Sequence, residues 1–193
     1  MYKMKRKTTK KTVVFVCTGN TCRSPMAEYV FRQRITQLGL TKLKIVSAGT
    51  HAHAGDKINE KTAQILASMG IRPRAFKAKQ IDEKTLKDSL AVICMTDAQR
   101  DTLMEMRWQV LRAAGEEDIE NNVYALSDIT GYQIIDPYGK DMDCYRYVYE
   151  LIAGGIPALI DKILPKEIWG KYIPKPKTTA TAPKKPRKTK KEL

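Results

Sequence analysis

The chain has 193 residues, of which 42% are hydrophobic and 29% charged, and its formal net charge is +14 at pH 7. This length accommodates one domain of ordinary size with a proper core. The apolar run at 13–17 breaks after five residues, so we expect neither a signal-peptide core nor a membrane span. Four cysteines without a disulfide-like pattern are typical of a reducing compartment, so we expect a cytoplasmic protein.

The excess positive charge lies at the two ends of the chain. Residues 1–12 carry six Lys or Arg and no acid, and residues 165–193 carry ten Lys or Arg and two Glu, whereas residues 13–164 balance 19 basic against 19 acidic residues. We therefore expect a basic extension at 1–11, a folded domain at 12–164 and a disordered Pro- and Lys-rich tail at 165–193. The simpler interpretation of these tails is a solubilising role, and the alternative is binding to a polyanion.

Strand-like runs alternate with stretches of helical periodicity along the central part of the chain. We expect strands at 12–17, 43–47, 90–95 and 123–126, and helices at 25–38, 59–69, 97–114 and 142–164. Gly154, Gly155 and Pro157 should kink or split the last helix. The alternation predicts an α/β fold with a parallel sheet covered by helices on both faces. Ligands of such sheets bind beyond the carboxyl ends of the strands.

The segment that follows the first expected strand has the residue types of a phosphate-binding loop. It consists of Cys17-Thr18-Gly19-Asn20-Thr21-Cys22-Arg23-Ser24-Pro25. Glycine and asparagine accept positive φ most readily, so the loop can turn its backbone N–H groups toward one centre. The helix behind the loop adds positive dipole potential. The result is a phosphate-sized cradle with the Cys17 thiol at its floor and the Arg23 guanidinium at its rim.

The same Cys-x5-Arg spacing occurs from Cys94 to Arg100, where we expect no phosphate site. That segment contains no glycine, and Asp97 would place a negative charge where the phosphate should lie. Cys94 is therefore interpreted as a small apolar residue at a buried strand end. The same interpretation of Cys17 leaves the glycine, the asparagine and the absence of acids unexplained, so we favour a nucleophile at Cys17.

Cysteine-based phosphate chemistry requires a thiolate, a phosphate binder and a proton donor for the leaving group. The loop N–H groups, the helix dipole and Arg23 favour the thiolate of Cys17, and Ser24 offers it a hydroxyl. Arg23 suits two phosphoryl oxygens as a planar fork, which lysine cannot replace. The best candidate for the donor is Asp136, because Pro137 holds it extended in a stiff turn. An Asp-Pro pair is also a common turn opener, so both interpretations of Asp136 stay open.

The stretch from Cys17 to Glu28 resembles the signature of the low-molecular-weight protein phosphatases. Further matches follow in order at Ser47-Ala48-Gly49, Met95-Thr96 and Asp136-Pro137-Tyr138-Gly139. The resemblance covers about residues 12–164 and implies a single three-layer domain with a four-stranded parallel sheet flanked by helices. It implies Cys17 as nucleophile, Arg23 as phosphate binder, and Asp136 as general acid and then as base for the water that hydrolyses a phosphocysteine. It needs no metal and no cofactor, and it assigns substrate binding to Thr18, Gly19, Asn20, Thr21, Cys22, Ser24 and Tyr138.

Thr21 bears on the substrate. Tyrosine-specific members of the family usually have an aliphatic residue here, and threonine resembles the protein-arginine phosphatase branch. A hydroxyl beside the line of attack suits a guanidino group better than a phenyl ring, although one such change discriminates by only ~1–3 kcal/mol. We therefore predict a phosphatase for phosphoarginine in proteins, with a low-molecular-weight protein-tyrosine phosphatase as the alternative. The structural interpretation of Thr21 is a small polar filler in a tight loop.

Two other classes of protein share parts of this pattern. A thioredoxin-coupled arsenate reductase has a similar loop but needs two further cysteines close together in sequence, whereas Cys94 and Cys144 are 50 residues apart. A phosphate-binding module without catalysis would leave both Cys17 and Asp136 unexplained. Both classes are therefore less favoured than the phosphatase.

Three features near the loop have open interpretations. Cys22 either closes a reversible disulfide over Cys17 or fills buried space. His51 and His53 lie in a Gly/Ala-rich stretch without further metal ligands, so we expect a mobile loop near the cleft. Residues 76–80 stand where many family members have a histidine and arginines, so a supporting polar contact is expected to be missing.

Overall fold

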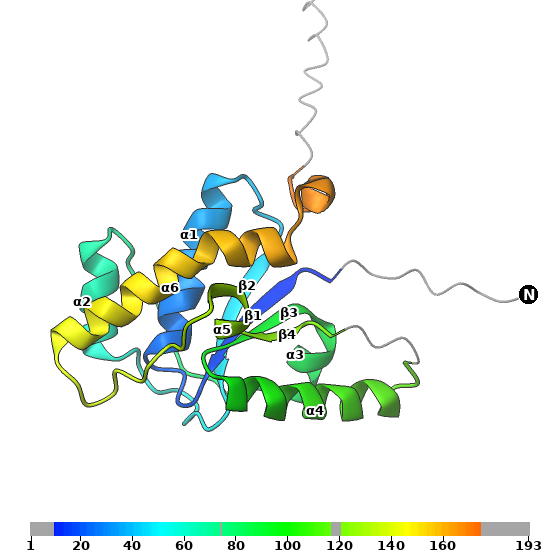
Figure 1. Ribbon diagram of the computed structural model, residues 1–193, viewed down its shortest axis with the longest axis horizontal. Helices are drawn as coiled ribbons and strands as arrows, with labels where there is room; N and C mark the ends of the chain where they lie inside the picture. Colours follow the sequence, from blue (N-terminus) through cyan, green and yellow to red (C-terminus); the bar gives the residue numbers. More distant parts are fainter. Residues whose placement is uncertain (1–9, 74, 117–120, 175–193) are drawn as a thin grey trace, which may run out of the picture.

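The computed structural model describes residues 10–73, 75–116 and 121–174, and its centre is a four-stranded parallel sheet. The strands are β1 (Thr12–Cys17), β2 (Lys44–Gly49), β3 (Ser89–Cys94) and β4 (Val123–Ala125), in the spatial order β2-β1-β3-β4 (Figure 1). The predicted four-stranded parallel sheet is confirmed. β1 is a central strand with a hydrogen-bonded neighbour on each side. The residue that follows its carboxyl end therefore lies between the ends of the neighbouring strands.

Helices cover both faces of the sheet. Figure 1 shows α1, α2 and α6 on one side and α3 and α4 on the other. Their bounds are α1 (Arg23–Gln37), α2 (Glu60–Ser68), α3 (Glu83–Asp88), α4 (Asp97–Ala113), α5 (Ser127–Thr130), α6 (Met142–Ile163) and the 3₁₀ helix η1 (Lys166–Lys171). The sequence predicted α1, α2, α4 and α6 and missed α3, α5 and η1, which are too short to show a helical period.

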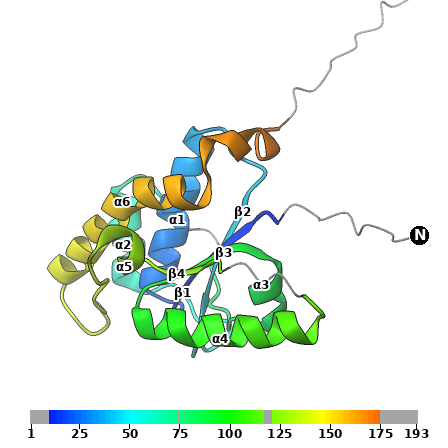
Figure 2. The same ribbon diagram turned by 45° about the vertical axis from the view of Figure 1, so that its right-hand side comes forward.

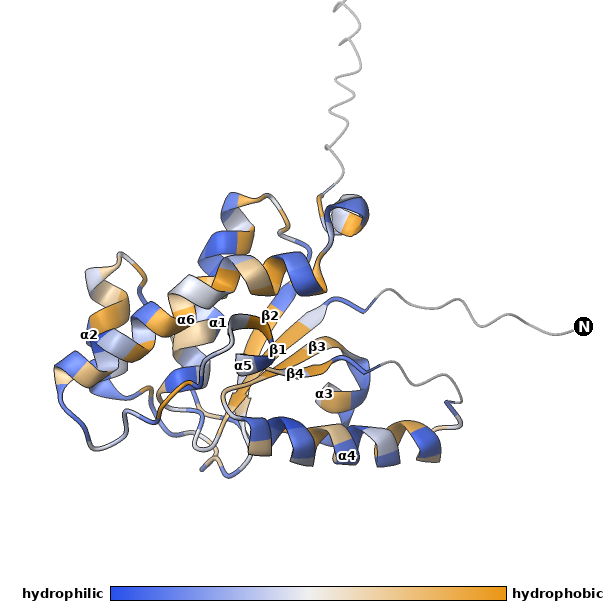
Figure 3. Ribbon diagram, viewed as in Figure 1, coloured by the Kyte–Doolittle hydropathy of each residue, from blue (hydrophilic) through white to orange (hydrophobic). Residues whose placement is uncertain are grey.

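The strands are mostly apolar, as their predominantly orange colour in Figure 3 shows. Alternate residues of β1 point to opposite sides of the sheet. Val13 and Phe15 belong to the core beneath α1 and α6, and Phe15 meets Phe31 of α1 edge-on at 5.3 Å. Val14 and Val16 belong to the smaller core on the side of α3 and α4. The near-continuous apolar sequence of β1 therefore reflects burial on both faces.

The glycine pair and the proline do not split α6, which runs unbroken from Met142 to Ile163 with Pro157 inside. The glycines have a packing role instead. A Cβ on Gly155 would lie 2.6 Å from the Thr130 side chain, and the Tyr132 hydroxyl donates to the Leu151 carbonyl at 2.8 Å. The predicted split of α6 is therefore wrong, and the small residue Gly155 instead leaves room for the α5 segment to approach the helix closely.

Residues 165–174 also differ from the expected disordered tail. After η1, Tyr172 is 2% exposed and its carbonyl accepts a hydrogen bond from the Lys42 N–H at 3.0 Å. Its hydroxyl lies 3.4 Å from the Lys10 carbonyl, so a side-chain contact links the two described ends of the chain. Figure 2 shows η1 on the side of the molecule where β1 begins. Aromatic burial explains this order. The predictions for 1–9 and 175–193 lie outside the described residues.

Candidate active site

Residues 18–22 connect β1 to α1 at the carboxyl end of the sheet, where the sequence placed the phosphate loop. Asn20 adopts a left-handed φ of 54° and is completely buried. Its amide donates to the Ser24 hydroxyl at 2.9 Å, and its carbonyl oxygen accepts from the Lys79 N–H at 2.9 Å. Asn20 therefore shapes the loop and ties it to residues 78–80. Gly19 is not in the left-handed region, so that part of the conformational prediction is wrong.

The contact with Lys79 bears on the predicted gap at residues 76–80. The sequence suggested that a polar contact is missing there, because no histidine or arginine is present. A backbone N–H supplies the hydrogen bond to Asn20 instead. Backbone groups are common to every residue type, which is why composition could not reveal this contact.

Cys17 ends β1 with its thiol beside the Ser24 hydroxyl. The distance from Cys17 Sγ to Ser24 Oγ is 3.0 Å, so the contact expected from sequence is present. Ser24 Oγ also lies 3.2 Å from the Ala48 carbonyl oxygen. A hydroxyl has a single proton and rotates freely, so Ser24 can turn this proton from the carbonyl to a Cys17 thiolate.

The end of β2 supports the loop from the side. The Thr50 N–H donates to the Cys17 carbonyl and the His51 N–H to the Thr18 carbonyl, each at 2.9 Å. A Cβ on Gly49 would lie 2.4 Å from the Thr18 carbonyl oxygen. Only glycine fits this close backbone approach, which gives the Ser47-Ala48-Gly49 motif a physical reason.

Arg23 is the first residue of α1 and is 4% exposed. Its Nη2 forms an ion pair with Asp136 Oδ2 at 2.6 Å, and Nη1 donates to the Ile134 carbonyl at 3.4 Å. Its buried Nε has no hydrogen-bond partner within the described residues. A buried guanidinium N–H without an acceptor is costly, so the site suits an anion that accepts from Arg23.

The predicted turn at 136–139 brings Asp136 to this arginine across 113 positions of sequence. The Tyr138 N–H donates to Asp136 Oδ1 at 3.1 Å, and the Asp136 side chain is 52% exposed. One carboxylate oxygen thus faces the turn and the other faces Arg23. The carboxyl group lies at the solvent side of the site, where a leaving group would emerge.

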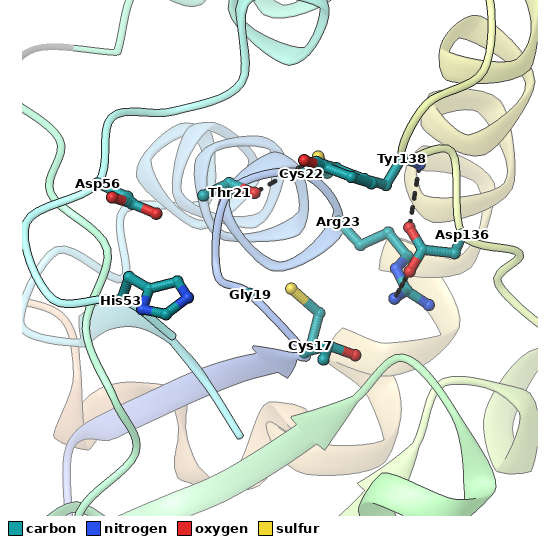
Figure 4. Close-up of a pocket in the computed structure, with 10 residues that line it drawn as sticks. Cys17, Gly19, Thr21, Cys22, Arg23, His53, Asp56, Asp136 and Tyr138 are labelled. Carbon is teal, nitrogen blue, oxygen red and sulfur yellow. Dashed lines mark hydrogen bonds and ion pairs between the residues drawn. The ribbon is translucent and has the colours of Figure 1, made fainter. Parts of the chain in front are cut away.

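The loop, the arginine and the turn enclose a pocket of about 280 Å³, drawn in Figure 4. Eight predicted site residues line it: Cys17, Thr18, Gly19, Thr21, Cys22, Arg23, Asp136 and Tyr138. The other two, Asn20 and Ser24, lie beneath the loop as described above. The sequence missed His53 and Asp56, which complete the wall. His53 was expected only on a mobile loop near the cleft, and Asp56 gave no local signal.

Cys22 is a buried neighbour of the pocket. Its Sγ lies 3.4 Å from the Tyr145 hydroxyl and 3.6 Å from Thr21 Oγ1. Burial raises the pKa of the Cys22 thiol above its ordinary value, which favours the neutral form. Both sequence interpretations of Cys22 therefore stay open. No group of three or more His, Cys, Asp or Glu in the described part of the chain is arranged to hold a metal ion.

Comparisons with known proteins point to one family. The family model described as low molecular weight phosphotyrosine protein phosphatase matches residues 12–168. Low molecular weight protein-tyrosine phosphatase A of Mycobacterium tuberculosis is 32% identical over 152 residues, which is 77% of this chain and 89% of that protein.

Solved structures agree in fold. The YwlE arginine phosphatase from Geobacillus stearothermophilus has a TM-score of 0.65 and 26% identity, with 79% of this chain and 92% of that chain covered. YfkJ from Bacillus subtilis has a TM-score of 0.68 and 32% identity, with 81% and 96% covered. The matched region contains every residue that lines the pocket.

Proposed function

We propose that this chain, which belongs to the low molecular weight phosphotyrosine protein phosphatase family, hydrolyses phosphoarginine in proteins through a phosphocysteine intermediate. Membership makes it a cysteine-based phosphatase, whose substrate is a phosphorylated protein. The observation that supports the catalytic assignment most directly is the shared pocket of Cys17, Arg23 and Asp136. It combines a thiol, a buried cation with a free N–H and a carboxyl group around a pocket that has room for a phosphoryl group and part of the side chain that carries it.

In the first step, the Cys17 thiolate attacks phosphorus and an S–P bond forms. The bond from phosphorus to the leaving nitrogen breaks, and its electron pair stays on nitrogen. Protonated Asp136 gives its proton to this nitrogen, so the arginine side chain departs as a guanidinium. Arg23 and the loop N–H groups hold the equatorial oxygens, where charge develops. The oxygens of a bound phosphoryl group compete with the Asp136 carboxylate for the guanidinium N–H groups of Arg23. This competition frees the carboxyl group to face the leaving group.

In the second step, water attacks the phosphocysteine. Asp136, now a carboxylate, takes a proton from this water as the O–P bond forms. The S–P bond breaks, and its electron pair returns to sulfur. Ser24, 3.0 Å from the sulfur, stabilises the departing thiolate by turning its proton toward it. Inorganic phosphate leaves, and the thiolate is restored.

The choice of phosphoarginine over phosphotyrosine rests on Thr21, which lines the pocket. An aliphatic residue here would pack on a phenyl ring, whereas a hydroxyl beside the phosphorus suits a polar guanidino group. Relatives named as tyrosine phosphatases and a structure titled as an arginine phosphatase both resemble this chain, so the protein-tyrosine phosphatase is the alternative. The arsenate reductase is less favoured, because Cys94 is buried in the core on the α4 side of the sheet.

A side-by-side assay on phosphoarginine and phosphotyrosine peptides tests this substrate. Wild-type enzyme should have the higher kcat/KM on phosphoarginine, and Thr21→Ile should shift the ratio toward phosphotyrosine by roughly tenfold or more, which corresponds to ~1.4 kcal/mol. Thr41→Ile, the same change at an exposed residue far from the pocket, is the control and should leave the ratio alone. A wild-type preference for phosphotyrosine would establish the tyrosine alternative, and an unmoved ratio in Thr21→Ile would remove the support that Thr21 gives to the arginine assignment.

Polyanion binding by the basic tails and a cytoplasmic location are separate proposals. In the described residues no helix has the length and apolar character needed to cross a membrane. Deletion of residues 174–193, which keeps the buried Tyr172, should weaken binding to duplex DNA and flatten its salt dependence, because fewer lysines then displace counterions. Turnover of a small aryl phosphate should stay the same. Equal DNA binding by both forms would favour the solubilising role.

A further inference from the structure

We propose that Asp56 is the carboxylate that binds the guanidinium group of the substrate, which makes it a specificity-determining residue. The inference rests on the proposed action on phosphoarginine and adds the missing partner for the positive charge of that substrate. It starts from the wall of the pocket formed by His53 and Asp56, which belongs neither to the catalytic loop nor to the turn at 136–139.

Asp56 lies across the pocket from the predicted proton donor. In Figure 4 the Asp56 carboxylate and the His53 ring enter from one side, and Asp136 and Tyr138 face them from the other. The Asp56 side chain has no hydrogen bond or ion pair within the described residues, although Lys57 follows it in the chain. An exposed carboxylate that lines a pocket and has no cation of its own is available to a cationic ligand.

The wall that holds Asp56 is fixed by backbone hydrogen bonds. The Gly55 N–H donates to the Ala78 carbonyl at 2.9 Å, the Ala78 N–H donates to the Asp56 carbonyl at 2.8 Å, and the Asp56 N–H donates to the His53 carbonyl at 3.2 Å. The next residue, Lys79, donates its N–H to Asn20 in the phosphate loop. Asp56 is thus held at a set position relative to the loop, and none of these bonds uses its side chain. The sequence predicted a mobile loop around His51 and His53, whereas backbone hydrogen bonds hold this segment, His53 included, against the neighbouring segment.

The chemistry of the first step requires such a residue. Asp136 must hold a proton when the thiolate attacks, so at that moment it is neutral and cannot balance the guanidinium charge. The Arg23 cation faces the phosphoryl oxygens and repels a second cation. A carboxylate at Asp56 supplies the negative charge and accepts N–H bonds from the planar guanidinium. Phosphotyrosine carries only the negative charge of its phosphate group, so a carboxylate at Asp56 repels this substrate.

The test compares Asp56→Asn with wild-type enzyme on phosphoarginine and phosphotyrosine peptides of the same sequence. The KM for phosphoarginine should rise roughly tenfold, the loss typical of one charge-assisted hydrogen-bonding partner. The KM for phosphotyrosine should fall, since a repulsive charge is removed. Asp56→Glu should restore most of the phosphoarginine preference. Asp161→Asn, the same change at an exposed position of α6, should alter neither KM.

The outcomes separate this inference from the proposed function. If wild-type enzyme prefers phosphoarginine but Asp56→Asn moves both KM values in the same direction or neither, only the role of Asp56 is overturned. If wild-type enzyme prefers phosphotyrosine, the proposed substrate is overturned, and the guanidinium site with it. Opposite shifts of the two KM values, reversed by Asp56→Glu, establish the site.

Discussion

The chain contains two Cys-x5-Arg segments at the carboxyl ends of adjacent parallel strands. Cys17 ends β1 and Cys94 ends β3, and the ladder pairs Val16 with Cys94. Their arginines differ in surroundings. Arg23 is buried with one carboxylate and a free Nε, whereas Arg100 forms ion pairs with Asp97, Asp101 and Asp128. The first arginine has room for an anion, and the second is already neutralised.

The difference arises from where each helix begins. After Cys17, five loop residues precede α1, and Arg23 is its first residue. After Cys94, the Thr96 side chain accepts from the Gln99 N–H and α4 starts at Asp97, so only Met95 and Thr96 lie between strand and helix, too few residues for a loop that surrounds an anion. Cys94 is completely buried, and burial raises the pKa of its thiol far above the ordinary value. The Cys-x5-Arg spacing alone is therefore not enough for a phosphate site. A helix that begins soon after the strand leaves no loop in which such a site can form.

The largest effect should come from replacing Cys17 and Cys94 in turn by serine. Cys17→Ser should abolish turnover but retain vanadate binding, because Arg23 and the backbone form the cradle. Cys94→Ser should keep its turnover and lose ~1–3 kcal/mol in the free energy of unfolding, since it buries a hydroxyl. Steady-state kinetics, vanadate titration and urea unfolding measure these changes. Turnover above a few per cent in Cys17→Ser would remove Cys17 from the nucleophile role.

The next effect should come from replacing one carboxylate beside each arginine. Asp136→Asn should slow substrates with poor leaving groups by ~10²–10⁴-fold, the usual contribution of a general acid. An activated aryl phosphate should suffer less in the first step. Asp128→Asn, which removes one of the three carboxylates paired with Arg100, should leave both rates near wild type. Equal losses for Asp136→Asn on both substrates would indicate a structural role for that residue.

Replacing Arg23 and Arg100 in turn by lysine tests the comparison of the two segments further. Arg23→Lys should lower kcat by ~10²–10³-fold, as expected when a preorganised donor to the developing charge is lost. A point charge cannot reproduce the planar fork. Arg100→Lys should cost little activity, because its ion pairs are exposed and each contributes only ~0–1 kcal/mol. Full activity of Arg23→Lys in steady-state assays would show that simple charge is enough.

The smallest effect concerns oxidation and compares Cys22 with Cys94, two buried thiols outside the proposed nucleophile. Mild peroxide should inactivate wild-type enzyme reversibly, and Cys22→Ser should make the loss irreversible, because Cys17 then proceeds past the sulfenic acid. Cys94→Ser should behave as wild type. The measurement is activity recovered after thiol treatment. Full recovery of Cys22→Ser would favour the space-filling interpretation of Cys22.

The sequence by itself determined the local parts of this protein. Apolar strands buried on both faces, the four longer helices and the phosphate loop all follow from residues near one another in the chain. The interpretation of Cys94 as a small buried residue at a strand end is confirmed, and it rested on local signals, the missing glycine and the acid at Asp97. Such features depend on backbone preference, capping and periodicity, which a single sequence displays.

The tertiary structure alone decided what depends on contacts between distant segments. It paired Arg23 with Asp136, kept α6 unbroken by fitting Gly155 against Thr130, and ordered Tyr172 beside Lys10. It also placed Asp56 opposite Asp136. None of these has a local signal, because each is set by the close packing of segments that only folding brings together.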